Sequence, residues 1–113
     1  MKIAIDFDGT LTNEPFSSPQ TLKPSIQQLE VLKSHADLFV VTARRGKRLR
    51  KCKRFLKSNN VLDYFKSVGN KKVQADFYFD DRSMPIDWQV LLDVVTTNVD
   101  AAKLASEYFE RLV

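Results

Sequence analysis

Several residue types are scarce in this sequence, and each scarcity excludes a class of protein. Cys52 is the only cysteine, so the chain cannot form an internal disulfide. Three glycines and four prolines among 113 residues are too few for a collagen-like or low-complexity chain. No apolar run is long enough to cross a bilayer, and Asp6 interrupts the apolar N-terminal stretch too early for a signal peptide. We therefore expect a cytoplasmic protein with no membrane partner.

The hydrophobic fraction of the chain is 43%, which is typical of a globular protein. Its length suits one compact domain, which we expect to span residues 1–113. The formal net charge is only +4, but it is unevenly distributed, because eight of the eleven residues at 44–54 are basic. Such a cluster says more about partners than the net charge does, and it makes nucleic acid a candidate partner.

Apolar patterns along the chain alternate between those of strands and those of helices. Short apolar runs predict buried strands at residues 2–7, 38–41 and 77–79. Apolar residues at helical spacing predict helices at residues 24–35, with Pro24 in the first turn, and at residues 46–59. This alternation predicts an α/β fold, namely a Rossmann-like three-layer sandwich with a mainly parallel sheet.

The remaining segments are less regular. Residues 61–65 are expected to add one helical turn, and residues 87–95 fit either a helix or a strand. A last amphipathic helix should begin at Thr97 or Asn98. Trp88 and this last helix are expected to form part of the core or a contact in a homo-oligomer.

Carboxylates follow two of the predicted strands. Asp6 and Asp8 flank the end of the first strand, and Asp80 and Asp81 follow the strand at 77–79. Parallel sheets bind ligands beyond the carboxyl ends of their strands, so these side chains should meet at one edge. Gly9 lets the chain turn sharply there and lets a ligand approach the backbone.

Four carboxylates at one edge repel each other, so a cation should lie among them. Hard oxygen ligands suit Mg²⁺, which proteins hold through one or two carboxylates plus water and substrate phosphate. Thr42 ends the second strand and offers a hydroxyl, and Lys71 or Lys72 offers an ammonium group for phosphate oxygens. Together these groups describe a site for phosphoryl transfer, in which one carboxylate attacks and the other handles protons.

The motifs IAIDFDGTLT, LFVVTAR, the lysine pair and FYFDDRS occur in this order between residue 2 and about residue 85. In this the chain resembles the haloacid dehalogenase superfamily of phosphatases, and FYFDDRSMPIDW is similar to its small capsule-biosynthesis-type members. The resemblance implies an aspartyl-phosphate mechanism with Asp6 as nucleophile and Asp8 as acid and base. It also implies Thr42 and Lys72 as ligands of the phosphoryl group. Mg²⁺ would be held by Asp6, the backbone carbonyl of Asp8, Asp80 and Asp81.

Four residues at the ends of the first two strands, within the first two motifs, are the candidates for further contacts with a phosphorylated substrate: Gly9, Thr10, Ala43 and Arg44. Two features depart from the family pattern. Val73 follows Lys72 where the family often has proline, so Lys71 stays a candidate for the motif lysine. The segments between the motifs are also too short for a cap domain, so the site should be open.

Two other functions remain open at this point. The chain could be a receiver-like phosphoacceptor domain, although no lone aspartate ends a middle strand. It could also be a catalytically weak relative that binds polyanions through residues 44–54. The substrate itself is undetermined among sugar phosphates, nucleotides, polynucleotide ends and phosphoproteins.

Overall fold

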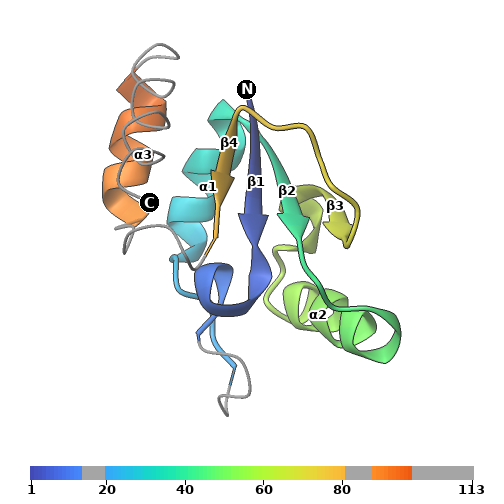
Figure 1. The fold of residues 1–113 in the computed structure, drawn as a ribbon. Coiled ribbons are helices and arrows are strands. Elements are labelled where there is room, and N and C mark those ends of the chain that lie inside the picture. Colours follow the sequence, from blue (N-terminus) through green and yellow to red (C-terminus); the bar gives the residue numbers. More distant parts are fainter. Residues whose placement is uncertain (14–19, 81–87, 98–113) are drawn as a thin grey trace.

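Within the part of the chain that the structure describes, the strands form a single all-parallel sheet in the order β3-β2-β1-β4 (Figure 1). The structure is a computed structural model, and it describes residues 1–13, 20–80 and 88–97. Its strands are β1 (Lys2–Asp6), β2 (Asp37–Val41), β3 (Phe65–Gly69) and β4 (Phe77–Phe79). This topology confirms the predicted α/β fold of Rossmann-like type.

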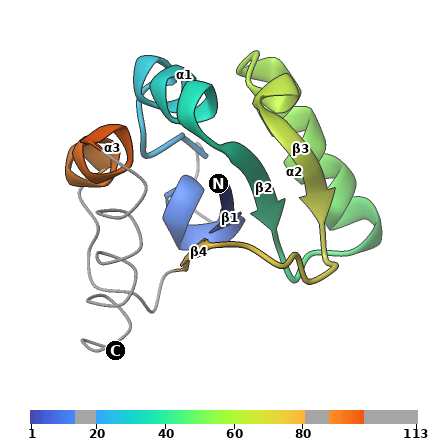
Figure 2. The same ribbon diagram turned by 90° about the horizontal axis from the view of Figure 1, so that it is seen from above.

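Two α-helices and two short helical turns lie between the strands, and a third α-helix follows β4, within the described residues. They are η1 (Phe7–Leu11), α1 (Ile26–His35), α2 (Gly46–Ser58), η2 (Leu62–Tyr64) and α3 (Trp88–Thr97). Helices α1 and α3 pack against each other, side by side in both views (Figures 1 and 2). Turn η1 and helix α2 lie at the carboxyl ends of the strands, which point downward in Figure 1.

The core lies between the sheet and these helices. The central strand β1 buries three successive residues, Ile3, Ala4 and Ile5, because strands pair with it on both sides. Each neighbouring element adds fully or nearly fully buried apolar side chains: Leu38 and Val40 from β2, Leu29 and Leu32 from α1, Cys52 and Leu56 from α2, and Leu91, Leu92 and Val95 from α3. A strand with neighbours on both edges and apolar residues throughout holds its carboxyl end in a fixed position.

The boundaries of two predicted helices shift by a few residues, for identifiable reasons. Helix α1 begins at Ile26 and not at Pro24, because Ser25 is its N-cap. The Ser25 hydroxyl accepts a hydrogen bond from the Gln28 backbone, and the Gln28 side chain accepts one from the Ser25 backbone. Helix α2 ends one residue earlier than predicted, and Asn60 follows it with a positive φ of 59°, as expected for Asn.

The prediction for residues 61–65 was wrong in its second half. A 3-10 turn is present at Leu62–Tyr64, but Phe65 begins strand β3, which the sequence pattern did not indicate. The ambiguous segment that includes Trp88 is a helix. Trp88 is partly buried against the core, with its ring centroid 6.1 Å from that of Phe79. The predicted last helix lies outside the described residues, apart from its possible first residue, Thr97, which ends α3.

The connections between the described elements are short, and no second domain is inserted in the ranges 1–13, 20–80 and 88–97. Residues 70–76 simply return from the carboxyl end of β3 to the amino end of β4 (Figure 1). The described helices include none that is both long and apolar enough to cross a membrane.

Candidate active site

The order of the strands creates a switch point between β1 and β4. The chain runs from β1 through β2 to β3 on one side, and then returns to place β4 on the other side of β1. Ligands of open α/β sheets bind at such points, beyond the carboxyl ends of the strands. Ile5 is paired with Phe79, so Asp6 and Asp80 are the next residues of the two strands at this point.

A pocket of about 320 Å³ opens at this end of the sheet. Its polar lining consists of Asp6 from β1, Asp80 just after β4, and Lys72 from the β3–β4 connection, together with Tyr78 of β4. Lys71 is not among its lining residues. Two carboxylates and an ammonium group, one from the N-terminal strand and two from the segment at 72–80, therefore share one pocket.

Asp8 is not among the residues that line that pocket, and β1 ends at Asp6, one residue earlier than predicted. Asp8 belongs to η1, where Gly9 turns the chain with a positive φ of 81°. Gly9 adopts this conformation without the steric cost that a side chain would add.

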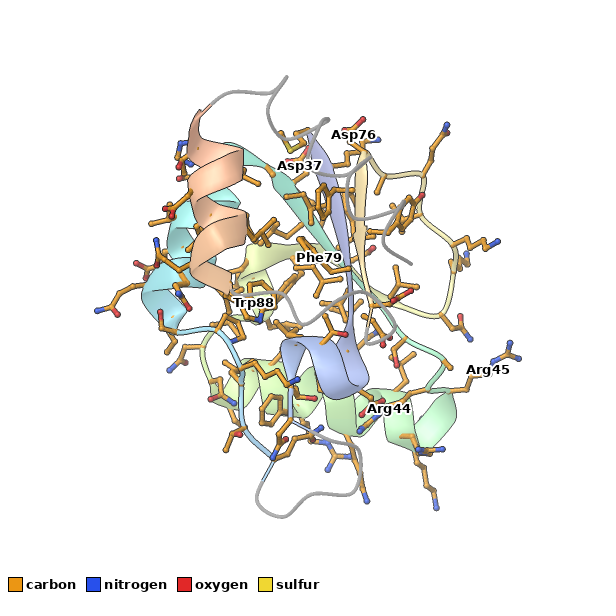
Figure 3. All side chains as sticks on the ribbon, turned by 60° about the vertical axis from the view of Figure 1, so that its left-hand side comes forward. Asp37, Arg44, Arg45, Asp76, Phe79 and Trp88 are labelled. Carbon is orange, nitrogen blue, oxygen red and sulfur yellow. The ribbon has the colours of Figure 1, made fainter. Side chains whose placement is uncertain are left out.

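The carboxylate of Asp8 instead forms a bidentate ion pair with Arg44. The Arg44 Nε donates to Asp8 Oδ2 at 2.9 Å, and the second guanidinium nitrogen donates to Oδ1 at 2.6 Å. The side chains are only 12% and 22% exposed, respectively. The guanidinium carbon also lies 5.0 Å from the centre of the Phe7 ring, in the range of a cation–π contact. Figure 3 shows Arg44 between η1 and the start of α2, while Arg45 extends outward.

This pairing raises the pKa of Arg44. The hydrogen bond to Asp8 is the main cause, and burial of the guanidinium opposes it. Planar guanidinium and carboxylate groups match each other in this two-bond geometry, which is stronger than a single contact between neutral groups. Arg44 therefore holds the Asp8 side chain in one orientation.

Thr42 lies directly beyond β2 and is almost completely buried. Its backbone N–H donates to the Gly69 carbonyl, and its hydroxyl accepts from the Arg44 backbone N–H at 3.1 Å. A hydroxyl that accepts in this way can still donate its own hydrogen. The neighbouring Ala43 is exposed. Thr42 thus orders the turn that carries Arg44.

Comparisons with known proteins agree with the fold and add no activity. No protein-family model matches the chain, and no curated protein matches it. A solved structure of a conserved protein coded by a locus of Bacteroides thetaiotaomicron is similar to it, with a TM-score of 0.66 and 24% sequence identity. The alignment covers 96% of this chain and 97% of that protein. At this identity the likeness establishes the shared fold alone.

The loop after η1 brings an additional cation to the site that the sequence pattern did not indicate. Thr12 and Leu22 form an isolated antiparallel bridge, and the Lys23 backbone N–H donates to the Leu11 carbonyl. The Lys23 ammonium group therefore reaches back and donates to the Gly9 carbonyl at 2.7 Å. No local sequence signal predicts this contact, because it depends on how the loop closes.

Thr10 does not present its hydroxyl to a ligand. Its Oγ1 is buried and has no hydrogen-bond partner among the residues that the structure describes. A contact between Thr10 and a substrate would therefore have to come from its backbone. The side chain of Thr12, also buried, donates to the Phe7 carbonyl and stabilises the same turn.

The donors in the pocket fit a hard divalent cation. Asp6 and Asp80 both line it, and Mg²⁺ takes one or two protein carboxylates plus water and phosphate oxygens. Asp81, the other predicted ligand, lies outside the described residues. Within the described ranges no three Asp, Glu, His or Cys side chains form a group suited to a metal ion. The Asp8 carboxylate is engaged by Arg44, which leaves its backbone carbonyl as the predicted ligand.

Cys52 takes no part in this chemistry. The side chain is fully buried in α2. Burial raises the pKa of its thiol to about 12, although the nearby Arg44 acts in the opposite direction. The basic surroundings in the sequence thus do not produce a thiolate, since the thiol faces the core.

Proposed function

We propose that this chain is a phosphohydrolase that cleaves phosphate monoesters through a phosphorylated Asp6, as expected of a haloacid dehalogenase-like enzyme. The observation that carries the proposal is the pocket at the switch point, which Asp6, Lys72 and Asp80 line together. A nucleophile, a cation for phosphate oxygens and a carboxylate for a metal are the parts that phosphoryl transfer needs.

The reaction would take place in two steps. In the first, an Asp6 oxygen attacks phosphorus, the bond from phosphorus to the ester oxygen breaks, and Asp8 gives that oxygen a proton. In the second, Asp8 takes a proton from water, and the water oxygen attacks the phosphorus of the aspartyl phosphate. The Asp6 carboxylate and inorganic phosphate are released, so both side chains return to their starting states.

The cation required by this scheme is Mg²⁺, which would be held by Asp6, the Asp8 carbonyl, Asp80 and Asp81. When bound, it neutralises negative charge on the transferring phosphoryl group. Lys72 adds positive charge at the same pocket and so offsets the repulsion between Asp6 and the phosphate. The Thr42 hydroxyl, the predicted ligand of the phosphoryl group, is almost completely buried and does not line the pocket, so it would have to become accessible before it could donate to a phosphate oxygen.

Arg44 would act on Asp8 and on the substrate in turn. While both Asp8 oxygens accept from Arg44, neither oxygen is free to exchange a proton with the ester oxygen or with water. For the first step Asp8 must carry a proton, so one of these hydrogen bonds has to break. A substrate phosphate supplies an alternative bidentate partner for the guanidinium, and this exchange would release Asp8.

A phosphoacceptor domain that keeps the phosphoryl group on aspartate is the competing function. The specific observation that favours it is the same ion pair, because an Asp8 held by Arg44 at both oxygens would activate water poorly. The two functions differ in turnover: a phosphoacceptor releases about one equivalent of product, whereas a phosphatase continues.

Hydrolysis of a small aryl phosphate with Mg²⁺ tests the proposal. The wild type should release many equivalents of product, and Asp6→Asn should release none above background. Asp93→Asn, an exposed change on α3, is the matched control and should retain wild-type turnover. A single burst of one equivalent would favour the phosphoacceptor, and full activity of Asp6→Asn would overturn both.

A further inference from the structure

Helix α2 carries an unusual concentration of positive charge. It contains seven lysines and arginines and no acidic residue in its 13 residues. Cys52 and Leu56 are its fully buried side chains, so its apolar side faces the core. All seven basic side chains are exposed: Lys47, Arg48, Arg50, Lys51, Lys53, Arg54 and Lys57.

Four of these side chains form one continuous face, which we call the basic face of α2: Lys47, Arg50, Lys51 and Arg54. Their spacings of three and four residues place them together on the surface opposite Cys52 and Leu56. Like charges at these spacings destabilise a helix. The ion pairs of Arg44 with Asp8 and of Lys66 with Asp37 involve none of these four side chains. An external anion would relieve the repulsion.

The basic face begins close to the candidate active site. Helix α2 starts at Gly46, two residues after the Arg44 that binds Asp8. At about 1.5 Å per residue, the distance along the helix from Lys47 to Arg54 is roughly 10 Å. One strand of a nucleic acid carries a phosphate about every 3.4 Å of helix rise, so this length matches about three or four nucleotides.

The chemistry of α2 distinguishes between possible polyanions. A helix that lies on a membrane inserts its apolar side among the lipids, but the apolar side of α2 is already buried. Its aromatic residue, Phe55, is half-buried with its ring centroid 5.9 Å from that of Phe7, so it does not offer an exposed platform for base stacking. Contacts with the basic face would therefore be to backbone phosphates and independent of base sequence.

We propose that the basic face of α2 binds the sugar-phosphate backbone of a single-stranded nucleic acid whose terminal phosphate enters the pocket at Asp6. This proposal names a substrate class for the proposed phosphohydrolase. Hydrolysis of the terminal phosphate depends on that proposed function. Binding itself requires only the charges of α2. The terminal phosphate of a free strand end reaches an uncapped pocket, while the following phosphates lie along the helix.

The test compares two variants that each remove three positive charges. One is Lys47→Gln, Lys51→Gln and Arg54→Gln on the basic face. The matched control is Lys2→Gln, Lys33→Gln and Lys66→Gln, three exposed lysines outside α2. Lys66 pairs with Asp37, which lies at the opposite end of the sheet from Arg44 (Figure 3). Both variants should fold, because glutamine is a good helix former and the changes are on the surface.

Binding of a fluorescent eight-nucleotide single strand with a terminal phosphate is measured by anisotropy between 50 and 200 mM salt. Each neutralised phosphate of a single strand contributes about −0.7 to the slope of log K against log salt, so four contacts predict about −2.8. Wild type and control should lose about 50-fold in affinity over this range, and the basic-face variant about threefold. All three should hydrolyse a small aryl phosphate equally.

The outcomes separate the inference from the proposed function. Equal salt slopes for all three proteins, or equal loss of affinity in both variants, would overturn the inference while aryl phosphate turnover continued. Poly-glutamate that bound as tightly as the oligonucleotide would also overturn it, by assigning the face to acidic protein segments. No turnover of either substrate, with the slopes as predicted, would overturn the phosphatase and leave the nucleic-acid surface supported.

Discussion

Replacement of Arg44 by methionine should destabilise the protein by about 2–3 kcal/mol. Hydrogen bonds to charged groups contribute about 1.5–3 kcal/mol, and a partly exposed cation–π contact about 0.5–1 kcal/mol. Breaking a fully buried ion pair costs roughly 3–5 kcal/mol of stability. Because the side chains of Arg44 and Asp8 are 12% and 22% exposed, the loss of stability should be smaller here. Methionine keeps much of the aliphatic length that packs beside Phe7, so the loss reports mainly on charge and hydrogen bonding.

The assay is a double-mutant cycle in urea without metal, with wild type, Arg44→Met, Asp8→Ala and the double variant. If the bidentate pair contributes as the distances indicate, the coupling energy should be about 2 kcal/mol. Arg45→Met is the control, since Arg45 is exposed and extends away from the site, and its effect should lie within about 0.5 kcal/mol of zero. A coupling energy below about 0.5 kcal/mol would show that the two side chains interact no more strongly than an ordinary surface pair.

Three further predictions follow from other parts of the structure. Millimolar Mg²⁺ should stabilise the wild type against thermal unfolding by about 2.7 kcal/mol at a hundredfold excess over Kd. Asp80→Ala should lose this effect. A wild-type Tm that is the same in Mg²⁺ and in EDTA would contradict the metal site. Burial raises the pKa of the Cys52 thiol from 9.0 to about 12, so the unfolded state releases this proton first as the pH rises. The contribution of the Cys52 thiol to stability should therefore be fully present below about pH 9, and the free energy of unfolding should fall by up to about 1.4 kcal/mol per pH unit toward pH 12. In urea titrations across that range, Cys52→Val should show a shallower fall. Parallel plots of unfolding free energy against pH for the two proteins would contradict this. Ser25→Ala removes the N-cap of α1 and should cost about 1 kcal/mol in the same assay, whereas Ser58→Ala at the exposed end of α2 should cost almost nothing.

Much of the fold could be predicted because its central elements have strong local patterns. Strand β1 is apolar from Ile3 to Ile5, and helix α2 alternates buried and basic residues with helical spacing. Strand β3 was missed because its sequence, FKSVG, has one buried residue, Phe65, and lies at the edge of the sheet in the described part of the chain. An edge strand depends on the neighbour with which it pairs, and that pairing is not visible in local sequence.

The candidate site could be predicted only to the level of strand ends. The rule that ligands bind beyond parallel strands correctly brings Asp6 and Asp80 to the same end of the sheet, and both line one pocket. The Arg44–Asp8 pair joins residues 36 positions apart. The pairing of β1 with β2 accounts for this contact. Asp6 pairs with Val41, Asp8 follows Asp6 by two residues, and Arg44 follows Val41 by three, so both side chains lie just beyond the paired strand ends. The contact between Lys23 and Gly9 depends on loop closure and could not have been inferred.

If Asp6 is the nucleophile, the phosphoryl group is attached to it between the two steps, and this intermediate can be trapped. Asp8→Asn should slow the second step, because the amide cannot take a proton from water. After this variant is mixed with Mg²⁺ and an aryl phosphate and quenched in acid, peptide mass spectrometry should find one added phosphoryl group on Asp6. Product release without any phosphorylated peptide, or a phosphoryl group on a different residue, would contradict the account.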